Sequence, residues 1–324
     1  MNKVRVVVVG AGDFGRNHAR VYRELDGAEL VGIVDADAER AAKIAQEFST
    51  EVISDIELLA GRVDAASVVV PTVAHSRVGG RLLELGIDVI VEKPIAASQA
   101  EADELIATAA RGKRILQVGH LERFNPGIVA VMPVVNRPLY FEVHRLGVFT
   151  PRSLDIDVVY DVMIHDLDIL LAIVNAPVVD IKAIGIPVLT DKVDIAHARI
   201  DFASGAVANI TASRVSTERV RKMRFFQQHE YISVDFTRQD ALRVRVVEPG
   251  PQPKFDFTTL PAEKVEPLRA ELRAFLDCVR TRQTPNVDGP AGRRALELAD
   301  QVMAGILEHG KRVQLGAFVS LQGK

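Results

Sequence analysis

The sequence predicts an α/β Rossmann domain, a doubly wound parallel sheet, followed by a domain with an open-faced, mainly antiparallel sheet (α+β). Residues 4–9 form an apolar run without polar alternation, which suits a strand buried on both faces of a parallel sheet. Apolar runs then alternate with helical segments as far as residue 118. Beyond residue 119 the chain changes to long extended runs joined by short turns, a pattern typical of antiparallel hairpins.

A glycine-rich loop follows the first strand, with Gly10, Gly12 and Gly15 in the G-x-G-x-x-G spacing. The first glycine permits a tight turn, the second lets the backbone approach a pyrophosphate, and the third lets the next helix pack on the strand. The helix dipole and first amides, beside Asp13 and Phe14, would then face the phosphates. A tight turn in some other α/β domain is the competing interpretation.

Asp35 ends a second apolar strand, residues 30–34, and stands 20 residues after Gly15. A carboxylate at this place accepts hydrogen bonds from an adenosine ribose, so we expect NAD as the cofactor, in preference to NADP. Arg40 is close enough in sequence to weaken that preference, although it also fits a charge on a helix surface.

The remaining elements of the first domain continue the alternation of strand and helix. Gly86 is expected to cap one helix in the left-handed conformation, and Ser98-Gln99-Ala100-Glu101 is a capping box that opens another. The expected helical segments are 16–25, 38–48, 56–59, 74–85 and 98–111, and the further strands are 51–53, 65–70, 87–91 and 115–118.

Ligands of such sheets bind beyond the carboxyl ends of the strands. Five residues stand at these ends and are expected to converge on one crevice: Gly10, Asp35, Pro71, Lys93 and His120. We therefore divide the chain into a dinucleotide-binding domain, 1–118, and a substrate-binding and oligomerisation domain, 119–324.

The second domain is expected to form one sheet with a helix on one face. Asn125-Pro126 begins a short helix, and residues 155–174 read as a single longer one. The extended runs are 139–148, 178–189, 194–202, 206–213, 224–236 and 242–247, and 249–253 is a loop. Two final helices, 262–280 and 289–309, are expected to pack back on the first domain.

Composition excludes several classes of protein. A chain of 324 residues with 48% hydrophobic and 26% charged residues is typical of two globular domains. A net charge of −3 gives no reason to expect nucleic acid as a partner. One cysteine, Cys278, forms no intramolecular disulfide, and no apolar stretch reaches the roughly 18 residues of a membrane span. We expect a cytoplasmic protein without a signal peptide.

Glu92-Lys93-Pro94 follows a strand on the side expected to face the cofactor. A lysine there can hydrogen-bond a substrate hydroxyl and stabilise its alkoxide. The alternative is a solvated loop lysine. A cis Pro94 would fix the direction of Lys93, which we state as a hypothesis.

Asp161 and His165 are four residues apart on one predicted helix, and Asp168 lies one turn further on the same face. Histidine is suited to accept a proton at neutral pH, and a nearby carboxylate would orient its ring. A structural pair at a domain interface is one alternative. A metal set is another, but no further ligand cluster has metal spacing, so we predict no metal.

Together, the glycine loop, the Glu-Lys-Pro and the Asp-x-x-x-His-x-x-Asp helix resemble the Gfo/Idh/MocA oxidoreductase family over essentially the whole chain. The resemblance implies a catalytic triad of Lys93, Asp161 and His165, with His165 as the acid/base. It also implies cofactor contacts by Pro71, Thr72, Glu92, Lys93 and His75, with His75 near the nicotinamide. The segment 152–159 departs from the family, because it lacks the glycine-rich loop of many members and carries Arg152, Asp155 and Asp157.

A narrower resemblance, to the UDP-N-acetylglucosamine 3-dehydrogenase branch, rests on residues 119–126 and 231–236. It implies a sugar-nucleotide substrate, and we expect the substrate to contact Arg123, Asn125, Arg152, Asp161 and His165. Five arginines on segments expected near the pocket mouth are candidate phosphate partners, and each also fits a solvated surface position: Arg123, Arg145, Arg152, Arg214 and Arg221.

Two other functions stay open. One is an inositol or free-sugar dehydrogenase on the same scaffold, and the other is a dinucleotide-sensing protein without turnover. Retention of all three catalytic residue types argues against the second. An open sheet with one uncovered face predicts a homodimer or homotetramer formed through the C-terminal sheet.

Overall fold

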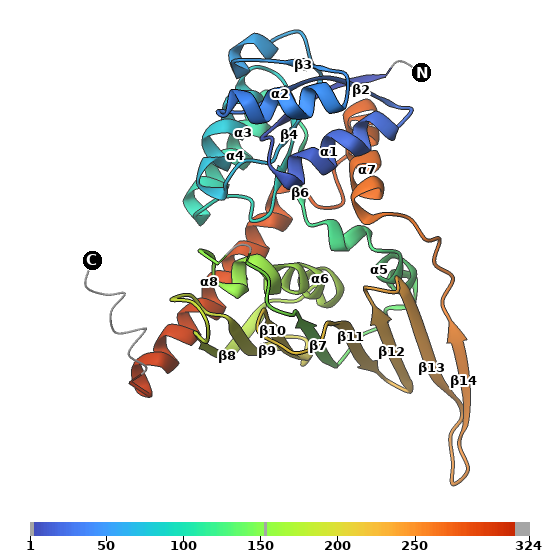
Figure 1. Cartoon of the computed structure of the whole chain (residues 1–324). Coiled ribbons are helices and arrows are strands. Elements are labelled where there is room, and N and C mark those ends of the chain that lie inside the picture. Colours follow the sequence, from blue (N-terminus) through green and yellow to red (C-terminus); the bar gives the residue numbers. More distant parts are fainter. Residues whose placement is uncertain (1–2, 152–153, 315–324) are drawn as a thin grey trace. The chain divides into compact units, whose positions relative to one another are not determined.

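The computed structural model describes residues 3–151 and 154–314. The chain divides into two compact units (Figure 1). Unit 1 is Met1–Phe124 with Val265–Leu296, and unit 2 is Asn125–Lys264 with Glu297–Lys324. Residues 265–296 thus return to unit 1 after the second sheet is complete.

Unit 1 contains a six-stranded, entirely parallel sheet in the order β3-β2-β1-β4-β5-β6. This order is that of the doubly wound dinucleotide-binding fold, so the predicted class is confirmed. The strands are β1 (Val4–Val9), β2 (Ala28–Val34), β3 (Glu51–Val52), β4 (Ala65–Val68), β5 (Asp88–Glu92) and β6 (Leu116–Gly119).

Helices pack on this sheet because the strand residues that point to each of its two faces are apolar. Val4, Val6 and Val8 of β1 belong to a core with the apolar sides of α1, α2 and α7. Val7 and Val9 point to the opposite face and are also buried. The helical segments of unit 1 are α1 (Asp13–Glu24), α2 (Ala38–Glu47), η1 (Ile56–Leu59), η2 (Thr72–Ala74), α3 (His75–Glu84), α4 (Gln99–Gly112), η3 (Leu121–Phe124) and α7 (Pro267–Thr281).

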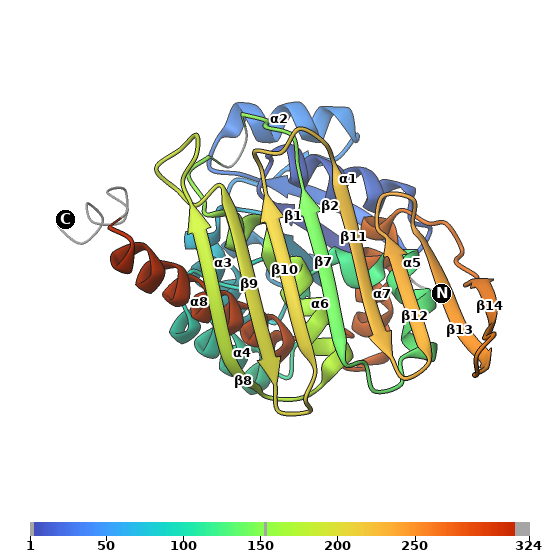
Figure 2. The ribbon, with the colours of Figure 1, turned by 90° about the horizontal axis from the view of Figure 1, so that it is seen from below.

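Unit 2 contains an eight-stranded sheet in the order β14-β13-β12-β11-β7-β10-β9-β8 (Figure 2). Only β7 and β10 pair in parallel, so the predicted mainly antiparallel sheet is confirmed. The strands are β7 (Tyr140–Leu146), β8 (Val178–Ile186), β9 (Ile195–Phe202), β10 (Val207–Ser213), β11 (Val220–Gln227), β12 (Glu230–Asp235), β13 (Asp240–Glu248) and β14 (Lys254–Thr259).

One face of this sheet is covered and the other is open. In β7, Phe141 and Val143 are buried, whereas Tyr140 and Glu142, which alternate with them along the strand, are partly exposed. Such alternation follows from the two-residue period of a strand. Helices α5 (Pro126–Val131) and α6 (Ile164–Val174) of unit 2 lie behind the sheet in Figure 2. The other helical segments of this unit are η4 (Met132–Val134), the π turn η5 (Val159–Met163) and the later part of α8 (Gly289–Arg312).

Several predicted boundaries were wrong. The extended run 224–236 is two strands of a hairpin, because His229 turns the chain in the left-handed region with φ 62°. Strand β14 was missed, since only the loop before it was identified. The helix predicted from 262 begins at Pro267, a proline at the first helical position with an extended residue before it.

None of the helices in the described ranges combines the length and the apolar composition needed to cross a membrane.

Candidate active site in two parts

The glycine loop after β1 has a shape that only glycine permits at two positions. Gly10 has φ 109°, and a Cβ there would lie 2.2 Å from the carbonyl oxygen of Val69. A Cβ on Gly15 would lie 1.8 Å from the carbonyl oxygen of Gly10, so loop and helix are in direct contact. At Gly12, by contrast, a Cβ would meet no described atom within 4 Å. The loop is therefore tight on its inner side and open at its middle glycine.

Helix α1 begins directly from this loop. Gly12 is its N-cap, and no described side chain caps the helix there. Asp13 and Phe14 form its first turn, so main-chain amides and the positive end of the dipole lie beside the open glycine. This arrangement fits the pyrophosphate of a dinucleotide, which needs backbone donors and space for close approach.

Asp35 follows β2 and is tied to the same loop. Its Oδ2 accepts a hydrogen bond of 2.5 Å from the amide of Ala11, and its Oδ1 accepts bonds of 2.8 Å from Asp37 N and Arg40 Nη2. Burial would raise the pKa of Asp35, but the bonds from Arg40, Ala11 and Asp37 outweigh it and hold the pKa below its usual value. An ionised carboxylate therefore stands beside the loop, with Arg40 paired to it.

The segment after β4 contains Pro71, Thr72 and His75. Pro71 is exposed and Thr72 opens a short 3-10 turn. His75 is buried, with Nδ1 2.8 Å from the carbonyl oxygen of Pro94 and Nε2 2.9 Å from that of Val70. Burial lowers the pKa of His75 and so favours the neutral ring. The imidazole thus links the segments after β4 and β5, and its nitrogens face protein carbonyls.

Lys93 stands at the end of β5 and is half-buried. Its amide donates a 3.2 Å hydrogen bond to Oε2 of Glu92, the buried last residue of the strand. The Lys93–Pro94 peptide bond is cis, as hypothesised from the sequence. Glu92, predicted as a cofactor contact, directs its carboxylate to partners inside unit 1.

Asp161 and His165 lie on one helical segment of unit 2, but its start differs from the prediction. Helical structure begins at Val158, not 155, and residues 159–163 form a π turn that leads into α6. Single π turns of this kind are rare and often mark functional sites. Asp161 belongs to the π turn and His165 to the first turn of α6, both half-buried, whereas Asp168 is buried.

A buried ion pair holds this helix against β7. Nε and Nη2 of Arg145 each donate a 2.8 Å hydrogen bond to the carboxylate of Asp166, and both side chains are almost inaccessible to solvent. The guanidinium carbon also lies 4.7 Å from the ring centroid of Phe236. Arg145 was a candidate phosphate partner, but its guanidinium instead anchors the residue next to His165.

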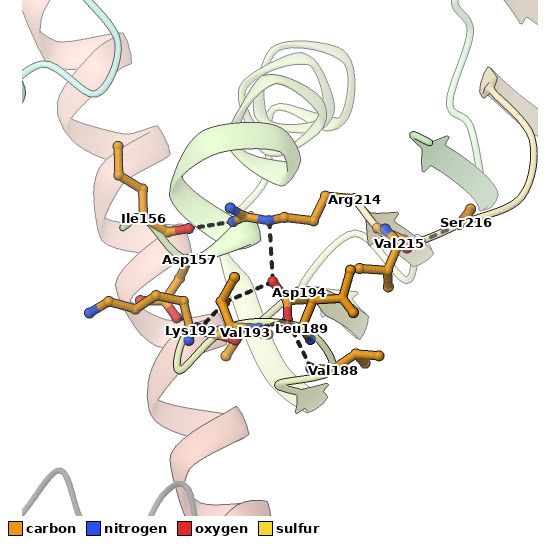
Figure 3. A network of polar contacts seen from close by, with 12 residues as sticks. Ile156, Asp157, Val188, Leu189, Lys192, Val193, Asp194, Arg214, Val215 and Ser216 are labelled. Carbon is orange, nitrogen blue, oxygen red and sulfur yellow. Dashed lines mark hydrogen bonds and ion pairs between the residues drawn. The ribbon is translucent and has the colours of Figure 1, made fainter. Parts of the chain in front are cut away.

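Arg214 is likewise used inside unit 2 (Figure 3). It donates to the carbonyl oxygen of Ile156, and its Nε lies 3.7 Å from the carboxylate of Asp194. That carboxylate accepts bonds of 2.7–2.9 Å from the amides of Val188, Leu189 and Thr190. Arg214, a candidate phosphate partner, therefore secures the segment before the π turn.

The other substrate candidates differ in their surroundings. Asn125 is buried, where its Oδ1 accepts from Gly127 N and its Nδ2 donates to the carbonyl oxygen of Phe236, so it caps α5. Arg123 is half-buried and its Nη2 donates a long bond of 3.3 Å to Asn286 Oδ1. Arg221 is exposed on β11, and Arg152 lies outside the described residues.

Two stretches of the chain match known sequence families. Residues 4–120 match the oxidoreductase family with an NAD-binding Rossmann fold, and residues 141–232 match the GFO/IDH/MocA C-terminal domain. This chain belongs to the Gfo/Idh/MocA oxidoreductase family. A nicotinamide cofactor therefore agrees with both the glycine loop and the family.

One member of the family is similar over nearly the full length. UDP-N-acetylglucosamine 3-dehydrogenase of Acidithiobacillus ferrooxidans is 38% identical over 94% of this chain and 98% of its own. A solved structure of that enzyme has a TM-score of 0.90 at 37% identity, over 94% of this chain and 98% of its own. Inositol 2-dehydrogenase 4 of Saccharopolyspora erythraea is 31% identical over 51% of this chain and 52% of its own.

Sequence reasoning missed His18, Ser67 and the Arg145–Asp166 pair. His18 could have been found, because it lies between Phe14 and Tyr22 at intervals of four on an amphipathic helix. A polar side chain on the buried side of a helix requires a partner. The partners themselves come from other strands and were not visible in the sequence.

Proposed function

We propose that this chain is an NAD-dependent sugar-nucleotide dehydrogenase that oxidises the hydroxyl on ring carbon three of UDP-N-acetylglucosamine. The observation that carries the proposal is the full-length similarity to an enzyme of that name, together with Lys93, Asp161 and His165 in the family's catalytic pattern. Bound NAD would supply the hydride acceptor.

The roles of the three side chains follow from their chemistry. His165 accepts the hydroxyl proton, since an imidazole is an effective base near neutral pH. Asp161 orients the ring from the preceding π turn. Lys93 stabilises the negative charge that develops on the substrate oxygen as its proton leaves. Together these groups raise the reactivity of the hydroxyl while the hydride departs from the same carbon.

Arg123 is our candidate for the substrate pyrophosphate, because a guanidinium binds phosphate oxygens in pairs. It follows β6 closely on η3, within unit 1. Its Nη2 lies 3.3 Å from Oδ1 and 3.5 Å from the carbonyl oxygen of Asn286.

The direct test is incubation with NAD and a panel of UDP-sugars, free hexosamines and inositols, followed at the NADH absorbance band. We expect turnover of UDP-N-acetylglucosamine and little of the free sugar, because the remote pyrophosphate orients the ring for hydride transfer. Turnover of free inositol equal to that of UDP-N-acetylglucosamine would favour an inositol dehydrogenase instead. Inositol 2-dehydrogenases match about half of this chain. Cofactor binding without turnover of any sugar would favour the dinucleotide sensor.

NAD is expected to bind at least about tenfold more tightly than NADP, since like charges in contact cost several kcal/mol and Arg40 offsets only part of this. The ionised Asp35 would repel a 2′-phosphate and accept a bond from a free 2′-hydroxyl. Fluorescence titration of both cofactors measures the ratio of the NADP dissociation constant to the NAD dissociation constant. Asp35→Ser should reduce it, whereas Asp37→Asn, which removes a neighbouring exposed charge, should not. Tighter binding of NADP by the unaltered protein would contradict this role of Asp35.

We also propose that the enzyme forms a homodimer or homotetramer through the open face of the unit 2 sheet. Five residues directly opposite one another on neighbouring strands make a row across that face, in which Phe226 and Phe257 are exposed and the others half-buried: Tyr140, Phe226, Tyr231, Val244 and Phe257. Ring centroids of Phe226 and Tyr231 are 5.2 Å apart, and Phe257 is 68% exposed. An apolar row of this extent is typical of an interface.

Light scattering after gel filtration tests this assembly. The double substitution Phe226→Asp and Phe257→Asp is expected to reduce the mass to that of one chain, because each new carboxylate would be buried in the interface. Leu58→Asp, at an exposed apolar position of unit 1, should leave the mass unchanged. A single-chain mass for the unaltered protein would refute the assembly.

We propose a cytoplasmic location for this enzyme. The single cysteine, Cys278, is a half-buried free thiol on α7, as suits a reducing compartment.

A further inference from the structure

A chain of buried polar side chains in unit 1 ends beside Lys93. The hydroxyl of Tyr22 lies 2.8 Å from Ser67 Oγ, which lies 3.0 Å from Nδ1 of His18. Nε2 of His18 lies 3.2 Å from Oε1 of Glu92. Tyr22 and His18 come from α1, Ser67 from β4 and Glu92 from the end of β5. Each of the first three is at most 1% exposed, and Glu92 is 8% exposed.

These contacts form a consistent series of hydrogen bonds directed toward Glu92. With Oε1 of Glu92 as the acceptor, Nε2 of His18 is the donor in the matching tautomer. Nδ1 in that tautomer accepts from the hydroxyl of Ser67, and Ser67 accepts from Tyr22. Burial raises the pKa of Tyr22, which keeps its hydroxyl protonated as the first donor. No contact in the series brings two donors or two acceptors together.

Neighbouring groups restrict the Glu92 carboxylate further. Its second oxygen accepts the amide hydrogen of Lys93 at 3.2 Å. Glu92 pairs with Gly119 across β5 and β6, and a Cβ on Gly119 would lie only 2.6 Å from Oε1. The ring of Phe14 packs edge-on against His18, with centroids 5.3 Å apart. The Glu92 carboxylate is therefore bonded to the His18 imidazole and to the Lys93 amide, and it lies close to Gly119 on the neighbouring strand.

We propose that His18, supported by Ser67, is a positioning residue for Lys93 and acts by holding the Glu92 carboxylate that binds the Lys93 amide. This proposal rests on the proposed function, in which Lys93 stabilises the reacting oxygen. Burying a carboxylate and an imidazole is costly, and apolar side chains would fill the same space without that cost. The series directs its donors to the carboxylate that accepts from the Lys93 amide, which gives these polar groups a role beyond packing.

Two substitutions at His18 separate the two ring nitrogens. The amide nitrogen of glutamine reaches the place of Nε2, whereas that of asparagine reaches only the place of Nδ1. His18→Asn is therefore expected to lower kcat on the order of tenfold, because a small displacement of a catalytic group reduces rate steeply. His18→Gln should restore most of this loss. NAD affinity and Tm should match between the two variants, and substrate deuterated at the oxidised carbon should show a larger isotope effect in His18→Asn.

Gly119→Ala moves the Glu92 carboxylate without altering His18, so it should reproduce the loss of kcat. Arg23→Ala, at an exposed position of α1, is the matched control and should change nothing. Equal kcat in His18→Asn and His18→Gln would overturn the proposal, as would unchanged kcat in Gly119→Ala. Lys93→Met tests the underlying function separately: full activity in that variant would refute the role of Lys93 itself, whatever the His18 variants do.

Discussion

Replacing His165 with asparagine is expected to lower turnover of the sugar nucleotide by about 10²-fold or more, the scale on which general acid–base groups act. Asparagine keeps a polar side chain in the first turn of α6 but cannot accept the hydroxyl proton. NAD affinity should stay the same, because His165 belongs to unit 2 and the glycine loop and Asp35 belong to unit 1. Steady-state kinetics across pH, together with cofactor titration, provides the measurement.

The matched control for His165 is His229→Asn. His229 is exposed in a hairpin turn with φ 62°, a conformation that asparagine tolerates well. Turnover should therefore be unchanged in this variant. Near-normal turnover of His165→Asn at every pH would show that another group accepts the proton.

Asp166→Asn is expected to destabilise the protein by about 3–5 kcal/mol, the usual cost of removing one partner from a buried ion pair. Asp166 is fully buried and accepts two hydrogen bonds from the Arg145 guanidinium, so the variant removes the negative charge that these bonds join to a buried cation. Urea unfolding followed by circular dichroism measures the change in the free energy of unfolding. Because Arg145 and Asp166 both belong to unit 2, the loss of stability should appear in the unfolding transition of that unit.

Two further variants test whether charge is the cause. Arg145→Met with Asp166→Leu removes both charges at once and should recover much of the stability, since apolar replacements of a buried pair are often nearly neutral. Glu24→Gln, which removes one of two exposed carboxylates beside Arg20 on the surface of unit 1, should cost no more than about 1 kcal/mol. A double variant as unstable as Asp166→Asn would instead attribute the loss to packing around α6.

The fold class was predictable because it depends on periodicity and on local backbone chemistry. Apolar runs such as 4–9 and alternating runs such as 140–146 indicate which faces are buried, and Gly10 and Gly15 permit a loop that no other residue allows. Boundaries were less predictable where a single residue decides them. His229 splits one extended run, and Pro267 delays a helix.

The sequence by itself determined the family pattern, because Lys93 stands in the tripeptide Glu-Lys-Pro and Asp161 and His165 stand four residues apart. Tertiary structure alone decided which charged side chains form ion pairs inside the protein. Arg145 and Arg214 look like free cations in the sequence, yet Asp166 and Asp194 occupy them. His18 meets Glu92 across 74 residues of chain. A buried polar group must find a partner to offset the loss of water, and that partner is chosen by packing between strands and helices that sequence spacing does not reveal.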